Sequence, residues 1–285
     1  MSVNHCAGLN CRKDVAMVKA ILVDPEKCIN CKACQVACKE WNRSGYDLEG
    51  AVAYGDLNMP KEITSKTWTR IIVNSGKNGD KPYLRFAKTQ CMHCDDAACV
   101  KACPTGATSK DEDGYTVFDA KKCIGCNYCV KACPFQACKY DEEKKEIHRC
   151  IFCPDRRAAG LATACSTHCP SGALTYGSVN EIESEAKKRL AVYSKKNPEA
   201  SIYGESEMGG LKYIYVLQGK PSAYGLPDKP TIPAGVTVWN SLVKPGGGVA
   251  AGALVVGAGA AALLNLRARR MEKLEEERLE KEQSK

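Results

Sequence analysis

Short apolar blocks separated by polar residues predict a few strands in the first third of the chain. Residues 19–24 (KAILVD) are apolar and β-branched enough for a short strand that leads into the first cysteine motif. Residues 64–73 and 83–87 predict two further strands, and Asn78-Gly79 between them is a turn pair typical of β-hairpins. The pattern therefore predicts a local hairpin just before the second cysteine motif.

Helix-forming residues dominate one later stretch. Residues 181–196 are rich in charge and in good helix formers, and Asn197-Pro198 is a typical helix end. We expect an exposed helix there, to which no chemistry is assigned.

One apolar block is long enough to cross a membrane. No charge lies between Lys244 and Arg267, so residues 245–266 form an uncharged run of about 22 residues, about 33 Å long as a helix. Many of these residues are small, which suits close packing on a neighbouring membrane helix. Because glycine is a poor helix former, a buried or disordered Gly/Ala segment is the alternative. We expect a transmembrane helix over 243–267, with Trp239 as an interfacial anchor.

Cysteine is far above its ordinary usage, with 19 among 285 residues, and most of these cysteines fall into four quartets. In each quartet two residues separate the first two cysteines and three residues separate the last two. The quartets are Cys28, Cys31, Cys34 and Cys38; Cys91, Cys94, Cys99 and Cys103; Cys123, Cys126, Cys129 and Cys133; and Cys150, Cys153, Cys165 and Cys169. The letters Lys-Ala-Cys-Pro end both the second and the third quartet, which indicates an internal repeat.

The third quartet reads C-x2-C-x2-C-x3-C-P, the spacing with which bacterial ferredoxins bind cubic iron–sulfur clusters. Three thiolates two residues apart let one loop curl around a cluster, and the fourth cysteine reaches a neighbouring cluster. Zinc sites draw on separated pairs of ligands, and cysteines two residues apart rarely meet disulfide geometry. The pattern favours 4Fe–4S clusters over zinc and disulfides and, because every quartet is complete, over 3Fe–4S clusters.

A fourth cysteine that crosses over requires the quartets to pair, and spacing alone leaves the pairing open. The second and third quartets are neighbours in sequence, which favours their pairing and leaves the first quartet for the fourth. The predicted ligand sets are the first set (Cys28, Cys31 and Cys34 with Cys169), the second set (Cys150, Cys153 and Cys165 with Cys38), the third set (Cys91, Cys94 and Cys99 with Cys133) and the fourth set (Cys123, Cys126 and Cys129 with Cys103).

Three cysteines stay outside the quartets. Cys6 and Cys11 are near the N-terminus, where we interpret them as free thiols rather than as an extra metal or disulfide site. No role is assigned to Cys138.

Four other side chains near the motifs have two interpretations each. Because the thiolate sets are complete, we interpret His93 and His168 as second-sphere or surface residues and not as ligands. Trp41 and Trp68 are interpreted as packing against a cluster shell rather than as electron relays.

The formal net charge of +8 changes this picture little. Such an excess is compatible with nucleic acid or an anionic membrane surface. Four oxidised clusters with their thiolates would bring about −8 and nearly cancel it, so we expect no nucleic-acid partner. The chain also lacks a Ser/His/Asp set, a glycine-rich phosphate loop and paired carboxylates in an apolar setting, so it is expected to be non-catalytic.

Over about residues 15–175 the motifs resemble the four-cluster iron–sulfur subunit of molybdopterin oxidoreductases. The phrases CQVACKEWN (34–42) and CMHC (91–94) most resemble the beta subunit of membrane-bound formate dehydrogenase. The later phrases YIYVL (213–217) and YGLP (224–227) are similar to the same subunit.

The resemblance implies a subunit that carries electrons from a molybdopterin catalytic subunit, with molybdenum or tungsten, to a membrane cytochrome b-type subunit and the quinone pool. It also implies that the first set lies nearest the catalytic subunit and the fourth set nearest the membrane. The same role in a respiratory hydrogenase or in a sulfur-compound or sulfoxide reductase is the alternative. A non-redox structural metalloprotein is an alternative of another class.

The expected fold class is α+β, with two pseudo-symmetric, loop-rich, bacterial-ferredoxin-like modules of two 4Fe–4S clusters each and a C-terminal transmembrane helix. The expected segments are a first module at 1–90, completed by 145–180, which holds the fourth quartet; a second module at 91–144; a helical extension and linker at 181–242; the transmembrane helix at 243–267; and a charged tail at 268–285.

Basic residues after the apolar run predict its orientation. Only Lys244 precedes the run closely, whereas it is followed by Arg267, Arg269, Arg270 and Lys273. By the positive-inside rule the tail is cytoplasmic and the cluster domain is periplasmic, anchored in the lipid by one helix. The first twenty residues lack the apolar core of a signal peptide, so we expect export on the twin-arginine signal of a catalytic partner.

Overall fold

The computed structural model describes residues 18–45, 60–78 and 80–243. Contacts divide the chain into two units, 1–236 and 237–285, and the described cysteines all belong to the first. The mixture of helices and strands agrees with the predicted α+β class.

Several predictions fall outside the described residues. These are the roles of Cys6 and Cys11, the charged tail 268–285, and the transmembrane helix 243–267 beyond its first residue. Among the residues that are described, no helix has the length and apolar character needed to cross a bilayer.

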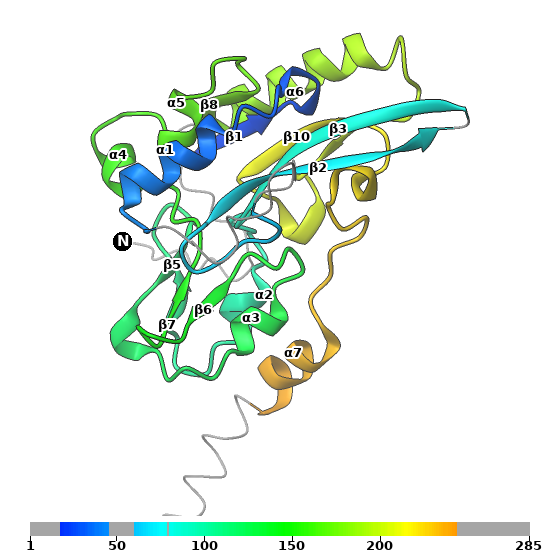
Figure 1. The fold of residues 1–285 in the computed structure, drawn as a ribbon. Coiled ribbons are helices and arrows are strands. Elements are labelled where there is room, and N and C mark those ends of the chain that lie inside the picture. The colour runs from blue at the N-terminus through cyan, green and yellow to red at the C-terminus, as the bar shows by residue number, and fades with distance from the viewer. Residues whose placement is uncertain (1–17, 46–59, 79, 244–285) are drawn as a thin grey trace, which may run out of the picture. The chain divides into compact units, whose positions relative to one another are not determined.

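A four-stranded mixed sheet organises the first unit, in the order β8-β1-β10-β9 (Figure 1). Its strands are β1 (Lys19–Val23), β8 (Leu174–Ser178), β9 (Ala200–Tyr203) and β10 (Tyr213–Gln218). Strand β1 runs parallel to β10 and antiparallel to β8, and β9 is antiparallel to β10. The predicted strand at 19–24 is confirmed as β1, and as a central strand it is almost fully buried.

The two faces of the sheet have different neighbours, because successive side chains of a strand point to opposite faces. On one face, Ala20 and Leu22 pack with Ile182 and Ala186 of helix α6 (Val179–Tyr193). On the other face, the alternate residues Ile21, Val23, Tyr213 and Tyr215 share a core with cysteines of the first, second and third sets. The sheet therefore lies between α6 and the cysteine-rich core.

The segment 181–242, predicted as a helical extension and linker, contains more strand than expected. Strands β9 and β10 complete the sheet, and η3 (Glu207–Gly209) lies between them. Residues 213–217 are all buried, and such a continuous apolar run is typical of a strand covered on both faces. The helical part of the prediction is confirmed by α6, although this helix begins two residues earlier than predicted and ends before residue 194.

Helix α6 begins at a capping box, which explains where it starts. The Ser178 hydroxyl accepts a hydrogen bond from the Glu181 backbone N–H (3.3 Å), and the Glu181 carboxylate accepts one from the Ser178 backbone N–H (2.7 Å). We expect Ser178→Ala to lower the free energy of unfolding by about 1 kcal/mol, measured by urea denaturation. Ser194→Ala at the other end of α6 serves as the control and should change it by less; equal losses would contradict the cap.

The predicted hairpin is confirmed, with shifted boundaries. Strand β2 (Thr69–Asn78) pairs with β3 (Lys81–Gln90), and Asn78 is opposite Lys81. Residues 64–68, predicted as the start of the first strand, instead form a turn. The cause is local, because the Thr64 hydroxyl accepts hydrogen bonds from the backbone N–H groups of Lys66 (3.2 Å) and Thr67 (2.9 Å).

The remaining elements are short and occur in pairs. Helix α1 contacts α5 and helix α2 contacts α3, while β4 pairs with β5 and β6 with β7. Their bounds are α1 (Ala33–Asn42), α2 (Ala98–Lys101), α3 (Tyr128–Ala132), α4 (Pro154–Ala158), α5 (Ala164–Thr167), α7 (Ala234–Val238), β4 (Thr108–Lys110), β5 (Thr116–Phe118), β6 (Lys139–Asp141) and β7 (Glu146–His148). Single turns of other helix types are η1 (Pro25–Lys27), η2 (Ala120–Lys122), η4 (Pro221–Tyr224) and a π turn at Trp239–Val243.

Candidate iron–sulfur sites

The connection between the first two cysteines has one backbone feature in common in every quartet. The residue before the second cysteine has a positive φ in all four cases: Asn30 (55°), His93 (50°), Gly125 (69°) and Phe152 (59°). Positive φ is uncommon outside glycine, and a left-handed residue lets successive backbone N–H groups converge on an anion. Four repeats of such a turn suit four anionic sulfide-bearing groups.

The third cysteine of every quartet is the second residue of a helix. Cys34 lies at this position in α1, Cys99 in α2, Cys129 in α3 and Cys165 in α5. None of these four helix starts has a side-chain cap. The first backbone N–H groups of these helices are therefore not bound by a capping side chain next to the third cysteine.

The chain enters the first and third quartets through equivalent turns. Asp24 caps η1 by accepting a hydrogen bond from the Glu26 backbone N–H (3.2 Å), and Asp119 caps η2 by accepting one from that of Lys121 (3.0 Å). This similarity indicates that the two quartets begin equivalent structural modules.

The first predicted set lines one cavity. The wall of this cavity contains Cys28, Cys31, Cys34 and Cys169, although Cys169 is far from the others in sequence. Apolar side chains of Ile71, Phe86 and Leu174 complete the wall. The Cys169 thiol lies 3.7 Å from the Ser171 hydroxyl, which is a hydrogen-bonding group for this sulfur.

The second predicted set lines a second cavity. The wall of this cavity contains Cys38, Cys150, Cys153 and Cys165, again across a long sequence separation. Polar groups contact three of the sulfurs: Asn42 Nδ2 lies 3.6 Å from Cys38 Sγ, the Tyr213 hydroxyl 3.4 Å from Cys150 Sγ, and the Thr163 hydroxyl 3.4 Å from Cys165 Sγ. Hydrogen bonds to the sulfurs are one of the means by which a protein sets a cluster's potential.

The third and fourth sets share a buried group of side chains on the other module. Its cysteines are Cys99, Cys129 and Cys138, with Cys94, Cys123 and Cys133 packed against them. Burial raises the pKa of Cys91 to about 12, and negative charge on Cys94 contributes to the same shift. The hydrogen bond that Cys133 donates to Cys138, together with burial, raises the pKa of Cys133, and negative charge on Cys91 contributes to the same shift. Members of the third set are therefore close neighbours.

The fourth set is brought together in the same way. Burial raises the pKa of Cys129 to about 12, with negative charge on Cys103 and Cys126 contributing. The Cys103 sulfur accepts a hydrogen bond from the Thr108 backbone N–H (3.5 Å) and lies 3.7 Å from the Thr105 hydroxyl. The structure thus places Cys103 beside cysteines of the next quartet.

Cys138, to which the sequence assigned no role, lies inside the third site. Its side chain is 1% exposed, hydrogen-bonds with Cys99 and Cys133, and has its sulfur 3.6 Å from Arg149 Nη1. The pKa of Cys138 is held well below its usual range, mainly by the hydrogen bonds that Cys133 and Cys99 donate to it. Burial acts in the opposite direction, and the nearby positive charge of Arg149 adds to the lowering. Spacing gave no signal for this placement, because Cys138 belongs to no regular interval.

The donor chemistry fits iron–sulfur clusters. All the described cysteines are free thiols, and burial raises the pKa of Cys34 and Cys153 to about 12. Iron therefore has to replace a proton at each of these sulfurs when a cluster binds. In the described part of the chain, no three His, Cys, Asp or Glu side chains lie close enough together to bind a single metal ion. This agrees with a 4Fe–4S cluster, because each thiolate binds a different iron of the cube and the four sulfurs are therefore further apart. A bound 4Fe–4S cluster supplies reversible one-electron storage.

The other predicted neighbours take distinct positions. Trp68 lines the second cavity, while Trp41 is 43% exposed and donates a hydrogen bond from Nε1 to Asp155 (2.9 Å). His93 is fully buried, and its Nδ1 accepts a hydrogen bond from the Thr116 backbone N–H (3.1 Å). Burial holds its pKa well below the usual range, so the imidazole is neutral. His168 is exposed on the surface.

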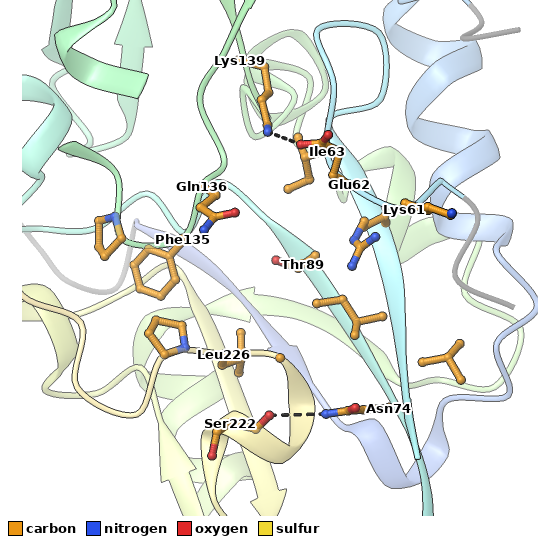
Figure 2. A pocket seen from close by; sticks show the side chains of 16 residues that line it. Lys61, Glu62, Ile63, Asn74, Thr89, Phe135, Gln136, Lys139, Ser222 and Leu226 are labelled. Carbon is orange, nitrogen blue, oxygen red and sulfur yellow. Dashed lines mark hydrogen bonds and ion pairs between the residues drawn. The ribbon is translucent and has the colours of Figure 1, made fainter. Parts of the chain in front are cut away.

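A broad surface groove lies outside these sites (Figure 2). It contains no predicted ligand, and its walls include residues 61–63, segment 134–136 and Leu226. Lys139 Nζ lies 2.6 Å from Glu62 Oε2, and Asn74 Nδ2 donates a hydrogen bond to the Ser222 carbonyl; dashed lines mark both contacts in Figure 2.

Comparison with known proteins agrees with the repeated geometry. Two families described as 4Fe–4S dicluster domains match the chain, one at residues 27–107 and the other at residues 83–179. The chain is therefore an iron–sulfur protein built from two dicluster domains.

The chain belongs to the family of formate dehydrogenase iron–sulfur subunits. It is 36% identical to the formate dehydrogenase iron–sulfur subunit of Haemophilus influenzae, over 83% of this chain and 77% of that protein. It is 35% identical to the nitrate-inducible formate dehydrogenase iron–sulfur subunit of Escherichia coli, over 82% of this chain and 80% of that protein. The thiosulfate reductase electron transfer subunit of Salmonella typhi is 37% identical over 57% of this chain and 77% of that protein.

Two predictions are confirmed by these relationships. The chain carries four 4Fe–4S clusters, and it is a non-catalytic iron–sulfur subunit.

Proposed function

We propose that this chain relays electrons through its four clusters between a molybdenum or tungsten catalytic subunit of a formate dehydrogenase and a membrane cytochrome b-type subunit. In this proposal the sixteen cysteines bind the clusters as the four sets defined above. The observation that carries the proposal is that each of the first two cavities is completed by a cysteine from a distant quartet, Cys169 in one and Cys38 in the other. The formate dehydrogenase relatives support the choice of complex.

Neighbour relationships support an order from the first to the fourth set. Lys88 borders both the first and the second cavity. Burial is the main cause of the raised pKa of Cys91 in the third set, and Cys150 of the second set contributes to it. Burial likewise raises the pKa of Cys129 in the fourth set, and Cys138 in the third site contributes most after it. In the proposal the four sites are successive neighbours along one electron path.

The ends of this path are near the surface. Ile29, next to Cys28 of the first set, is 62% exposed, and Ile124, next to Cys123 of the fourth set, is 66% exposed. In the proposal the first end receives electrons from the catalytic subunit and the fourth passes them to the cytochrome.

Formate-driven reduction tests the proposal. In the purified complex, formate is expected to bleach the visible absorption of the clusters, whereas the chain alone should not respond to formate. Dithionite should reduce both. Relatives also include a subunit of the anaerobic dimethyl sulfoxide reductase of Escherichia coli and the thiosulfate reductase subunit. A different result would assign the chain to a thiosulfate or dimethyl sulfoxide reductase instead. In that case formate would not reduce the clusters, whereas thiosulfate or dimethyl sulfoxide would reoxidise clusters that dithionite has reduced.

The proposal also includes a location. Residues 243–267 would anchor the chain in the lipid, with tail 268–285 in the cytoplasm and the cluster domain in the periplasm. This part rests on the uncharged run and on the basic residues that follow it. Protease added to intact spheroplasts should cleave the cluster domain and spare the tail, with a cytoplasmic protein as the control. A protected cluster domain would reverse the orientation.

A further inference from the structure

A buried lysine lies between the first two cavities. Lys88, on β3, is 2% exposed, and its side chain belongs to the walls of both cavities. It shares one cavity wall with Cys34 of the first set and the other with Cys38, Cys150 and Cys165 of the second. No single cysteine set therefore accounts for its position.

The Lys88 ammonium group is held in place by neutral partners. Its Nζ donates a hydrogen bond to Gln90 Oε1 (2.7 Å) and lies 4.8 Å from the centre of the Tyr213 ring. Gln90 in turn donates from Nε2 to the Tyr215 hydroxyl (3.1 Å), which donates to the Lys88 carbonyl (2.7 Å). This closed network fixes the position of the charge.

No carboxylate pairs with Lys88 among the described residues, although charges this deeply buried normally require a counter-ion. The cysteines of the two cavities surround it, and they carry negative charge as thiolates when they bind clusters. A buried ammonium that faces thiolates and no carboxylate has those thiolates as its counter-ions.

We infer that Lys88 is a positioning residue for electron transfer, whose fixed positive charge raises the reduction potentials of the clusters held by the first and second sets together. This inference rests on the proposed function. Each reduction adds one electron from the donor and one negative charge to a cluster, and the nearby ammonium stabilises that added charge. A shared cation keeps the two potentials close, which favours passage of the electron between them in either direction.

Potentiometric titration of the full chain, purified anaerobically with its clusters, tests this inference. Low-temperature EPR should resolve four one-electron components. Lys88→Met keeps the length of the side chain and removes its charge. In this variant the reduction potentials of two of the four components should fall by about 59 mV each, which is a tenfold change in the equilibrium constant for reduction. Lys88→Arg keeps the charge and should leave all four nearly in place. The two that move should include the component lost in Cys150→Ala.

A second buried cation provides the matched control. Arg149 is 2% exposed, lies near Cys99 and Cys138, and has no carboxylate partner among the described residues. Arg149→Met should leave the two Lys88-dependent components where they are.

A nearly isosteric variant serves if Lys88→Met fails to bind a full set of clusters. Gln90→Glu places a carboxylate at the atom that already accepts from Lys88, so it neutralises the ammonium and should lower the same two potentials. If a variant with all four clusters shows no change in any of the four reduction potentials, or the same change in all four, the inference is wrong. The proposed electron relay would not be affected by either result. Wild-type protein without iron would instead refute the proposed function.

Discussion

Cys150→Ala is expected to remove the cluster of the second set and to interrupt electron flow at the second step. Cys150 is 8% exposed, lines the second cavity and has its Sγ 3.4 Å from the Tyr213 hydroxyl, so the variant leaves this site one ligand short. Changes beside a metal ligand typically cost about 10–100-fold in metal affinity, and the loss of a ligand should cost more. Iron per chain should fall from about sixteen toward about twelve.

Cys138→Ala is the matched control for this variant. Cys138 is buried, as Cys150 is, and contacts two of the ligands, yet it belongs to none of the four sets. It should keep about sixteen irons per chain. Iron loss in Cys138→Ala with full iron in Cys150→Ala would show that the ligand sets are wrongly assigned.

Asp24→Ala should produce the largest loss of stability. The Asp24 side chain is fully buried between β1 and η1, four residues before the first ligand, and accepts hydrogen bonds from Arg189 Nη1 (3.0 Å) and the Tyr193 hydroxyl (2.9 Å). It also caps η1. Breaking a buried ion pair by removing one partner leaves the other charge uncompensated, at a cost of about 3–5 kcal/mol. Urea denaturation under anaerobic conditions measures this change.

Glu185→Ala removes a different partner of the same arginine. Glu185 Oε1 lies 2.8 Å from Arg189 Nε, but its side chain is 37% exposed and one turn away on the same helix. A solvent-exposed pair of this kind contributes about 0.5 kcal/mol or less. Similar losses in the two variants would contradict the structural role given to Asp24.

Local patterns predicted much of the fold. The strand at 19–24 and the hairpin around Asn78 could be predicted because β-branched runs and turn residues act within a few positions. The cysteine intervals likewise predicted local turns that recur at all four quartets. The failure at 64–68 has the same local origin, since the Thr64 hydroxyl competes with strand pairing for nearby backbone N–H groups.

Long-range placement was less accessible. Nothing in the residues around Tyr213 identifies β1 as its parallel partner, because parallel neighbours are distant in sequence. The spacing of the cysteines also does not show which side chains from outside a motif lie beside its site. The positions of Cys138 beside the third set and of Lys88 between the first two cavities are therefore known only from the folded chain.

Iron and acid-labile sulfide analysis of anaerobically isolated protein tests the central claim most directly. Four cubic clusters held by the four sets require about sixteen irons and about sixteen sulfides per chain. Values near eight, or iron without matching sulfide, would contradict an electron path of four clusters.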